Sequence, residues 1–234
     1  MLEKNGRSFT PLTLTTSIHL THTYEIQKNS FGILHCLAGD SNIPYHSCPK
    51  RRSTRRTSPY YFMNAMKTLH LKTERLLLTP VTLADLSDLH TLLTEKQVRK
   101  FLFDDQEIPL SQTSEILHQV SDTFREKGYG LWFCRRRSTD ERGGIVGLFD
   151  FFSEDQPQLL YALLPPWQGQ GFATEASRSI IQYAFEELGY AYLTASCDAP
   201  NVKSIAVLER LGMRRFEEKL IEGKLLVFYR LDRT

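Results

Sequence analysis

Hydrophobic and polar positions follow two different periods along residues 67–234. Apolar residues recur every three to four positions in some segments, which predicts amphipathic helices, at residues 82–93, 111–127, 171–188 and 202–211. Short β-rich runs bounded by glycine, proline or charged turns predict strands, at residues 75–79, 129–136, 144–152, 158–164, 190–197, 215–219 and 224–231. Helices and strands are interspersed along the chain, and this order predicts one mixed α/β domain.

The spacing of these elements also predicts how the strands pair. Short turns separate the three runs within residues 129–164, so we expect three consecutive antiparallel strands. The strands at 158–164 and 190–197 flank a helix, and such a unit places its two strands parallel with a right-handed crossover. The fold class predicted is a central, mostly antiparallel, twisted sheet of about seven strands with one parallel βαβ unit and four helices.

Residues 1–66 have a different character from the rest of the chain. They are rich in Thr, Ser and His, show no sustained period, and hold eight Lys or Arg against three acidic residues. The basic run at 50–56 is compatible with an organelle transit peptide, a nucleic-acid-binding arm or a nuclear address. We favour an N-terminal extension that adds nothing to the fold, either disordered or translated from an upstream region, with Met66 as the natural start.

Composition narrows the function classes for residues 67–234. The whole chain is 41% hydrophobic and 24% charged, as in soluble globular proteins, and no run reaches the about 20 apolar residues of a membrane helix. The domain carries 21 basic and 24 acidic residues, which makes a nucleic-acid face unlikely. Cysteines without CxxC spacing indicate a reducing cytoplasm. We expect no metal, since common ligand spacing is not matched by His35, Cys36, His46 and Cys48.

The most informative segment joins a strand to a helix at residues 163–176, through a glycine-rich turn. Free N–H groups and the positive end of the helix dipole favour a phosphate at such a helix start, and glycines let the ligand approach the backbone. A dinucleotide-binding loop needs Gly or Ala where Thr174 stands, and a Walker loop needs Gly-Lys followed by Ser or Thr. Neither pattern is present, so the segment is either a different phosphate site or an ordinary helix start.

Gln168, Gly171 and Ala173 match the (Gln/Arg)-x-x-Gly-x-(Gly/Ala) signature of the GNAT superfamily of acetyltransferases. The chain resembles the ribosomal-protein N-terminal acetyltransferase-like branch of that superfamily. Three further segments resemble that branch in the correct order, namely its opening strand, its Asn-x-x-Ser element and its Leu-Gly-(Phe/Met) element, at residues 73–76, 201–204 and 211–213. The resemblance thus covers residues 67–231.

The resemblance implies an enzyme that transfers acetyl from acetyl-coenzyme A directly to a primary amine of a protein N-terminus or small molecule. Its partners would be acetyl-CoA and an amine acceptor, and we expect a monomer or homodimer. Together with the cysteine usage and the ligand spacing above, the prediction is a cytoplasmic enzyme that needs no metal. The resemblance also implies that the pyrophosphate is held by the main chain of Gly169, Gln170, Gly171, Phe172, Ala173 and Thr174.

Four further residues receive roles from the same resemblance. Gln168 orders the turn, and the N–H of Leu163 pairs with pantetheine and donates to the thioester carbonyl, where it stabilises the oxyanion. Asn201 contacts the cofactor arm, and Ser204 donates to the sulfur and protonates the leaving thiolate. Asn201 and Ser204 are equally good helix caps, so a capping role stays open.

The residue that accepts the proton of the amine is left open. Candidate carboxylates are Glu95, Asp150, Glu154 and Asp155, and each is also compatible with a solvated surface position. An acyl-enzyme path through Cys197 is a minor alternative.

Acceptor choice and catalysis itself also have alternatives. Relatives often carry Gly-Tyr where this chain has Leu160 and Tyr161, which leaves the acceptor undetermined. A non-catalytic coenzyme A-binding sensor would keep the turn at 168–173 without chemistry at Ser204.

Overall fold

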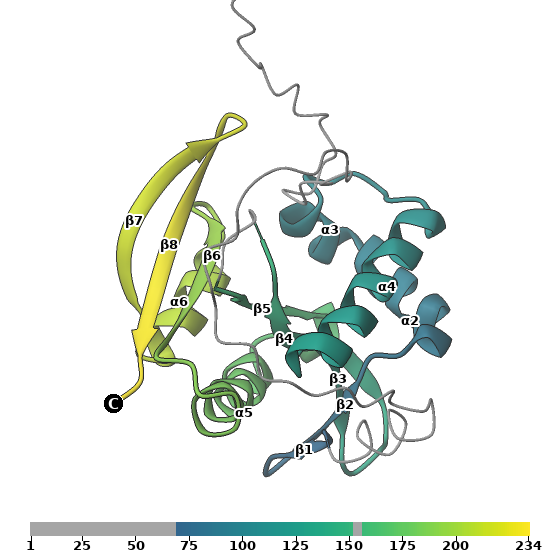
Figure 1. The fold of residues 1–234 in the computed structure, drawn as a ribbon. Coiled ribbons are helices and arrows are strands. Elements are labelled where there is room, and N and C mark those ends of the chain that lie inside the picture. Colours follow the sequence, from purple (N-terminus) through teal and green to yellow (C-terminus); the bar gives the residue numbers. More distant parts are fainter. Residues whose placement is uncertain (1–68, 152–155) are drawn as a thin grey trace, which may run out of the picture.

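The computed structural model describes residues 69–151 and 156–234, and the predicted extension at 1–66 lies outside them. The described chain forms one eight-stranded sheet in the order β1-β2-β3-β4-β5-β6-β8-β7 (Figure 1). The strands are β1 Leu71–Lys72, β2 Leu76–Pro80, β3 Leu131–Arg136, β4 Arg142–Phe149, β5 Gln158–Leu163, β6 Tyr192–Asp198, β7 Arg214–Ile221 and β8 Lys224–Asp232.

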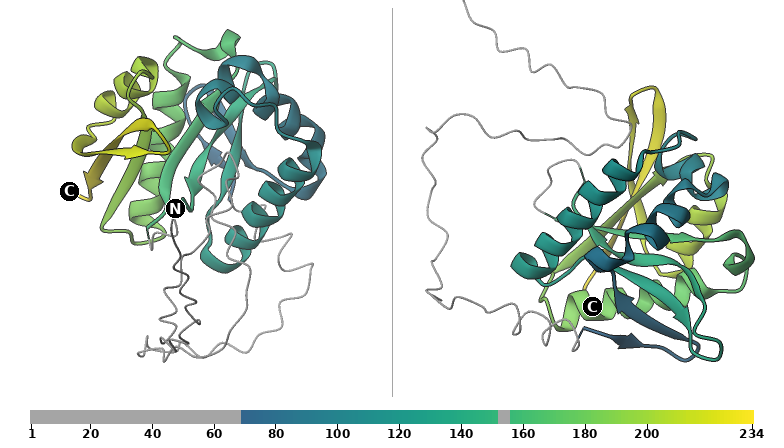
Figure 2. Two further views of the ribbon diagram at one scale, coloured as in Figure 1. Left: turned by 90° about the horizontal axis from the view of Figure 1, so that it is seen from above. Right: turned by 90° about the vertical axis from the view of Figure 1, so that its right-hand side faces the viewer.

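Helices cover both faces of this sheet (Figures 1 and 2). They are α2 Leu86–Thr94, α3 Lys96–Leu102, α4 Leu110–Lys127, α5 Phe172–Glu186 and α6 Val202–Arg210, with short 3₁₀ turns at Leu83–Asp85 and Pro165–Trp167. Helices α2, α3 and α4 lie on one face, whereas α5 packs on β4 and β5, and α6 on β6, on the other. No helix within residues 69–151 and 156–234 is long and apolar enough to cross a membrane.

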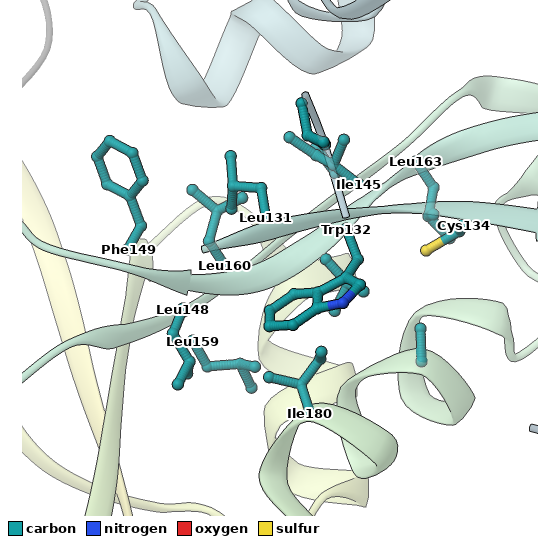
Figure 3. Close-up of a cluster of buried hydrophobic side chains, with 14 of the residues drawn as sticks. Leu131, Trp132, Cys134, Ile145, Leu148, Phe149, Leu159, Leu160, Leu163 and Ile180 are labelled. Atoms are coloured by element: carbon teal, nitrogen blue, oxygen red, sulfur yellow. The ribbon is translucent and has the colours of Figure 1, made fainter. Parts of the chain in front are cut away.

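Alternating side chains of β3, β4 and β5 fill two hydrophobic layers (Figure 3). Because successive strand residues point to opposite faces, each strand contributes side chains to both hydrophobic layers. Toward the α2–α4 layer point Leu131, Ile145, Phe149 and Leu160. Toward α5 point Trp132, Leu148 and Leu159, close to Ile180. The central part of the sheet, β3 to β5, is therefore buried from both sides, which fixes β5 and α5 relative to each other.

The predicted fold class is confirmed: the sheet is mostly antiparallel, and β5 and β6 are its one parallel pair among the described residues. Two elements were not predicted, the two-residue β1 and the seven-residue α3. Helix α3 has one buried residue, Val98, so it carries little apolar periodicity. The helix predicted at 82–93 is divided into the 3₁₀ turn Leu83–Asp85 and α2.

Candidate active site

A cleft opens where β5 and β6 separate. The two strands share one parallel pairing, Gln158 with Thr194, after which each pairs only with its antiparallel neighbour. The cleft between them has a volume of about 1960 Å³. Single-ligand pockets span about 300–1,000 Å³, so this cleft has room for a large cofactor and a second substrate.

The N–H of Leu163 faces this cleft. The next residue, Leu164, donates its N–H to the Gly143 carbonyl of the β4 side at 2.9 Å. Backbone groups of neighbouring residues in a strand point to opposite sides, so Leu163 presents its N–H and carbonyl toward β6. The Leu163 side chain is buried at the same time, and only its backbone is offered to a ligand.

The turn before α5 presents bare backbone donors to the same cleft. Gly169 and Gly171 adopt φ of +75° and +80°, in the left-handed region that favours glycine. Gly171 is the N-cap residue, and the first helical bond runs from the Glu175 N–H to its carbonyl at 3.0 Å. The N–H groups of residues 172–174 therefore lack helical partners, which is the arrangement that binds phosphate at a helix start.

Basic side chains add to this site. Arg75 donates from Nη1 to the Gln170 carbonyl at 3.0 Å and lies over the Phe172 ring, 4.4 Å from its centroid. Further along the cleft, its α5–α6 wall includes three cations, Arg178, Lys203 and Arg210. Several positive charges beside free N–H donors favour a ligand with more than one phosphate.

A partly buried carboxylate, Glu175, ties the turn to the start of the domain. Glu175 accepts hydrogen bonds from the Thr73 hydroxyl at 2.6 Å, the Arg75 N–H at 2.8 Å and the Arg75 Nε at 2.6 Å. Burial alone would raise the pKa of Glu175, but these bonds outweigh it and lower the pKa. The residues that resemble the opening strand of the family thus hold the first turn of α5 in place.

Gln168 links the two walls of the cleft. Its Nε2 donates to the Leu163 carbonyl at 2.9 Å, and its Oε1 accepts from Lys203 Nζ of α6 at 2.9 Å. The side chain therefore connects the end of β5, the turn and the second helix that borders the cleft.

The start of α6 brings polar side chains to the other wall. Asn201 caps this helix by accepting the Ser204 N–H at 3.2 Å. The Ser204 hydroxyl lies 2.8 Å from the hydroxyl of Tyr161 on β5. A hydroxyl donor is thus placed across the cleft from the Leu163 N–H.

Comparison with known families shows which family the chain belongs to. Residues 75–214 match the family described as Acetyltransferase (GNAT) domain. The chain belongs to the GNAT acetyltransferase family. The predicted membership of the GNAT superfamily and the predicted enzyme class are confirmed.

Individual relatives of this acetyltransferase are distant. The uncharacterized N-acetyltransferase YnaD of Bacillus subtilis is 25% identical over 151 residues, 63% of this chain and 84% of YnaD. The ribosomal L7/L12 alpha-N-protein acetyltransferase RimL, solved with coenzyme A, has a TM-score of 0.59 at 16% identity and covers 70% of this chain and 97% of its own. The microcin C7 self-immunity acetyltransferase MccE, solved with acetyl-CoA and AMP, has a TM-score of 0.57 at 17% identity over 68% and 93%. These two structures share the fold.

The carboxylates considered from the sequence are engaged elsewhere in the acetyltransferase or are not described. Glu95 caps α3 by accepting the Gln97 and Val98 N–H groups at 2.7 and 3.0 Å. Asp150 accepts from Tyr129 Oη and Lys127 Nζ, both at 2.6 Å. Glu154 and Asp155 lie outside the described residues.

Asp198, at the end of β6, is a carboxylate that sequence reasoning missed. It lines the cleft, is half-buried, and lies one residue beyond Cys197. Burial raises the pKa of the Asp198 carboxyl. The signal in the sequence was its place at a strand end beside the Asn-x-x-Ser element, but such a position does not reveal burial.

Cys197 is poorly suited to nucleophilic attack in this site. Burial raises the pKa of its thiol, and the hydrogen bond with Ser204 offsets only part of the rise. The thiolate is the reactive form, so the acyl-cysteine alternative loses support.

Proposed function

We propose that this acetyltransferase binds acetyl-CoA in the cleft between β5 and β6 and transfers the acetyl group directly to a primary amine. The observation that carries the proposal is the uncapped, glycine-led start of α5, which follows the end of β5 that has separated from β6. The chain belongs to an acetyltransferase family and has free phosphate donors at this position. Its cleft of about 1960 Å³ has room for both substrates.

The cofactor would lie along the features already described. The pyrophosphate accepts hydrogen bonds from the main chain of residues 169–174, with Gln168 holding the turn against β5. Pantetheine runs past Asn201 and pairs with the open edge of β5, where the Leu163 N–H donates to the thioester carbonyl. Acetyl-CoA supplies an activated acyl group at that point, and the residues around it hold, orient and polarise the reacting atoms.

The chemical step then needs three groups of this chain. The amine nitrogen attacks the thioester carbon and gives its proton to the Asp198 carboxylate. Negative charge develops on the carbonyl oxygen and is stabilised by the Leu163 N–H. When the C–S bond breaks, its electron pair goes to sulfur, which takes a proton from Ser204 as water restores that proton.

The acceptor class proposed is a primary amine on a protein N-terminus or a small molecule. The walls away from the phosphate turn come from α3 and from the β7–β8 turn, and Asp104 forms an ion pair with Lys224 between them. The acceptor would enter past this pair. We further propose that the protein works in the cytoplasm, as its cysteine usage predicts.

Incubation with labelled acetyl-CoA and an amine panel tests this function. The panel should contain peptides with free N-termini, polyamines, amino sugars and aminoglycosides, with acetylated product detected by mass spectrometry. We expect stoichiometric thiol release and acetyl-amine with at least one class. Tight coenzyme A binding without turnover on any class would instead support the non-catalytic sensor.

A further inference from the structure

Tyr161 is a partly buried residue that the proposed chemistry does not yet use. It lies on β5 and points to the α6 side, where its hydroxyl is 2.8 Å from Ser204 Oγ and 3.1 Å from the Ser204 carbonyl. The contact joins β5 to α6 across the cleft, in addition to the backbone pairing of Gln158 with Thr194 and the Ser196–Gln158 hydrogen bond between β6 and β5. It ends directly on the side chain proposed to meet the leaving sulfur.

The hydrogen-bonding capacity of a tyrosine explains what this contact does. A phenol has one proton, and burial raises the pKa of Tyr161, so the hydroxyl keeps that proton and acts as a donor. The Ser204 carbonyl at 3.1 Å and Ser204 Oγ at 2.8 Å both lie within hydrogen-bond distance of this hydroxyl, so Tyr161 holds the serine and its side-chain oxygen at the cleft wall. Without Tyr161, the serine is free to turn its proton to its own helix, as serines in helices commonly do.

We propose that Tyr161 is the positioning residue for Ser204, holding the serine hydroxyl at the cleft wall where it can meet the thioester sulfur. The inference rests on the proposed function, in which Ser204 serves the departing thiolate. Tyr161 itself touches neither substrate nor cofactor in this account and loses no proton. Its effect therefore reaches the reaction only through Ser204.

The test compares Tyr161→Phe with a matched control, Tyr183→Phe. Both tyrosines are partly buried and pack against the core, and each makes a hydrogen bond to a backbone carbonyl, but Tyr183 donates to Gly128 at 2.6 Å, away from the cleft. Loss of one hydrogen bond should lower kcat of Tyr161→Phe about tenfold. This factor corresponds to about 1.4 kcal/mol, near the upper end of what one hydrogen bond contributes. KM for acetyl-CoA and the coenzyme A Kd should stay within about twofold. Tyr183→Phe should keep wild-type kcat.

A double-mutant cycle separates positioning from a structural effect. If Tyr161 acts through Ser204, Tyr161→Phe combined with Ser204→Ala should be no slower than Ser204→Ala alone. Additive losses, or a normal kcat in Tyr161→Phe beside an impaired Ser204→Ala, would overturn this inference and leave the proposed function intact. A normal kcat in Ser204→Ala would count against the proposed function itself. If Tyr161→Phe alone has a low melting temperature, the comparison of the double variant with Ser204→Ala still tests whether Tyr161 acts through Ser204.

Discussion

Two helix starts border the same cleft, and they offer a ligand different chemistry. Helix α5 begins at a left-handed glycine, and in the described structure no side chain is bonded to its first N–H groups. Helix α6 begins at Asn201, whose side chain already accepts the Ser204 N–H. The first start therefore exposes backbone donors, whereas the second offers side chains.

This difference separates binding from chemistry. Phosphates are recognised well by a set of N–H groups and a helix dipole, which need no particular side chain. A leaving thiolate needs one donor at one position, which a hydroxyl oriented by its neighbours can supply. The comparison predicts that changes at α5 alter cofactor affinity, while changes at α6 alter turnover.

The largest effect is expected from Gly171→Val. A β-branched residue is strained at φ of +80°, although a Cβ there would meet only Arg75 Nη2, at 3.5 Å. The turn must shift, and coenzyme A should bind about 100-fold more weakly by calorimetry, a loss of about 2.7 kcal/mol.

Gly189→Val is the control for backbone strain alone. Gly189 has φ of +76° with nothing within 4 Å of an added Cβ, and it lies beyond the far end of α5. This variant should lose thermal stability and keep the coenzyme A Kd of the wild type. Normal binding by a folded Gly171→Val would remove the phosphate turn from the account.

Ser204→Ala changes the start of α6 and should alter turnover rather than cofactor affinity. A group that assists only the departing sulfur works in the transition state, so kcat should fall about 30-fold, or about 2 kcal/mol. The coenzyme A Kd should change less than about twofold. Steady-state kinetics and calorimetry on one preparation measure both values, and a weakened Kd with unchanged kcat would reverse the assignment.

Glu175→Gln tests how the α5 turn is held. The amide removes the charged acceptor of Thr73 and Arg75, and the free energy of unfolding should fall by about 1.5 kcal/mol. Because folding lowers the pKa of Glu175, its contribution is complete above the unfolded value near 4.5 and is lost as pH falls through the lower folded value. Denaturant titrations should show that the free energies of unfolding of wild type and Glu175→Gln converge below pH 4.5. As a control, Glu115→Gln on the exposed face of α4 should have the same free energy of unfolding as the wild type.

Asp198→Asn should have a smaller effect, because water can also accept the proton of the amine. At neutral pH we expect kcat/KM to fall about fivefold, about 1 kcal/mol. Burial raises the pKa of Asp198, so the wild-type carboxylate is protonated and loses its function as pH falls through that raised value. The ratio of wild-type kcat/KM to that of Asp198→Asn should therefore fall toward one at acid pH. A constant ratio, or equal activity at neutral pH, would remove Asp198 as the base.

Deletion of residues 1–65 should have the smallest effect. The segment has no periodic apolar positions that could dock on the domain, so melting temperature and coenzyme A Kd should stay near those of the full chain. A loss of more than about 1 kcal/mol would show that the extension belongs to the fold.

The sequence predicted features that depend on neighbouring residues. The apolar periods of α4 and α5, the glycine stop after α4 and the bare donors after Gln168 are all local properties. The contacts that position the site join distant residues: Tyr161 and Ser204 are 43 positions apart, and Thr73 and Glu175 are 102 apart. Sequence periods do not encode such pairs, nor the burial of Asp198.

Amide hydrogen exchange with and without coenzyme A tests the central claim most directly. If the start of α5 holds the pyrophosphate, exchange in residues 169–174 should slow in proportion to the bound fraction. The Ser204 amide is already bonded to Asn201 and should change less. Saturation with coenzyme A that leaves exchange in residues 169–174 unaltered would contradict the claim that this turn is the phosphate site.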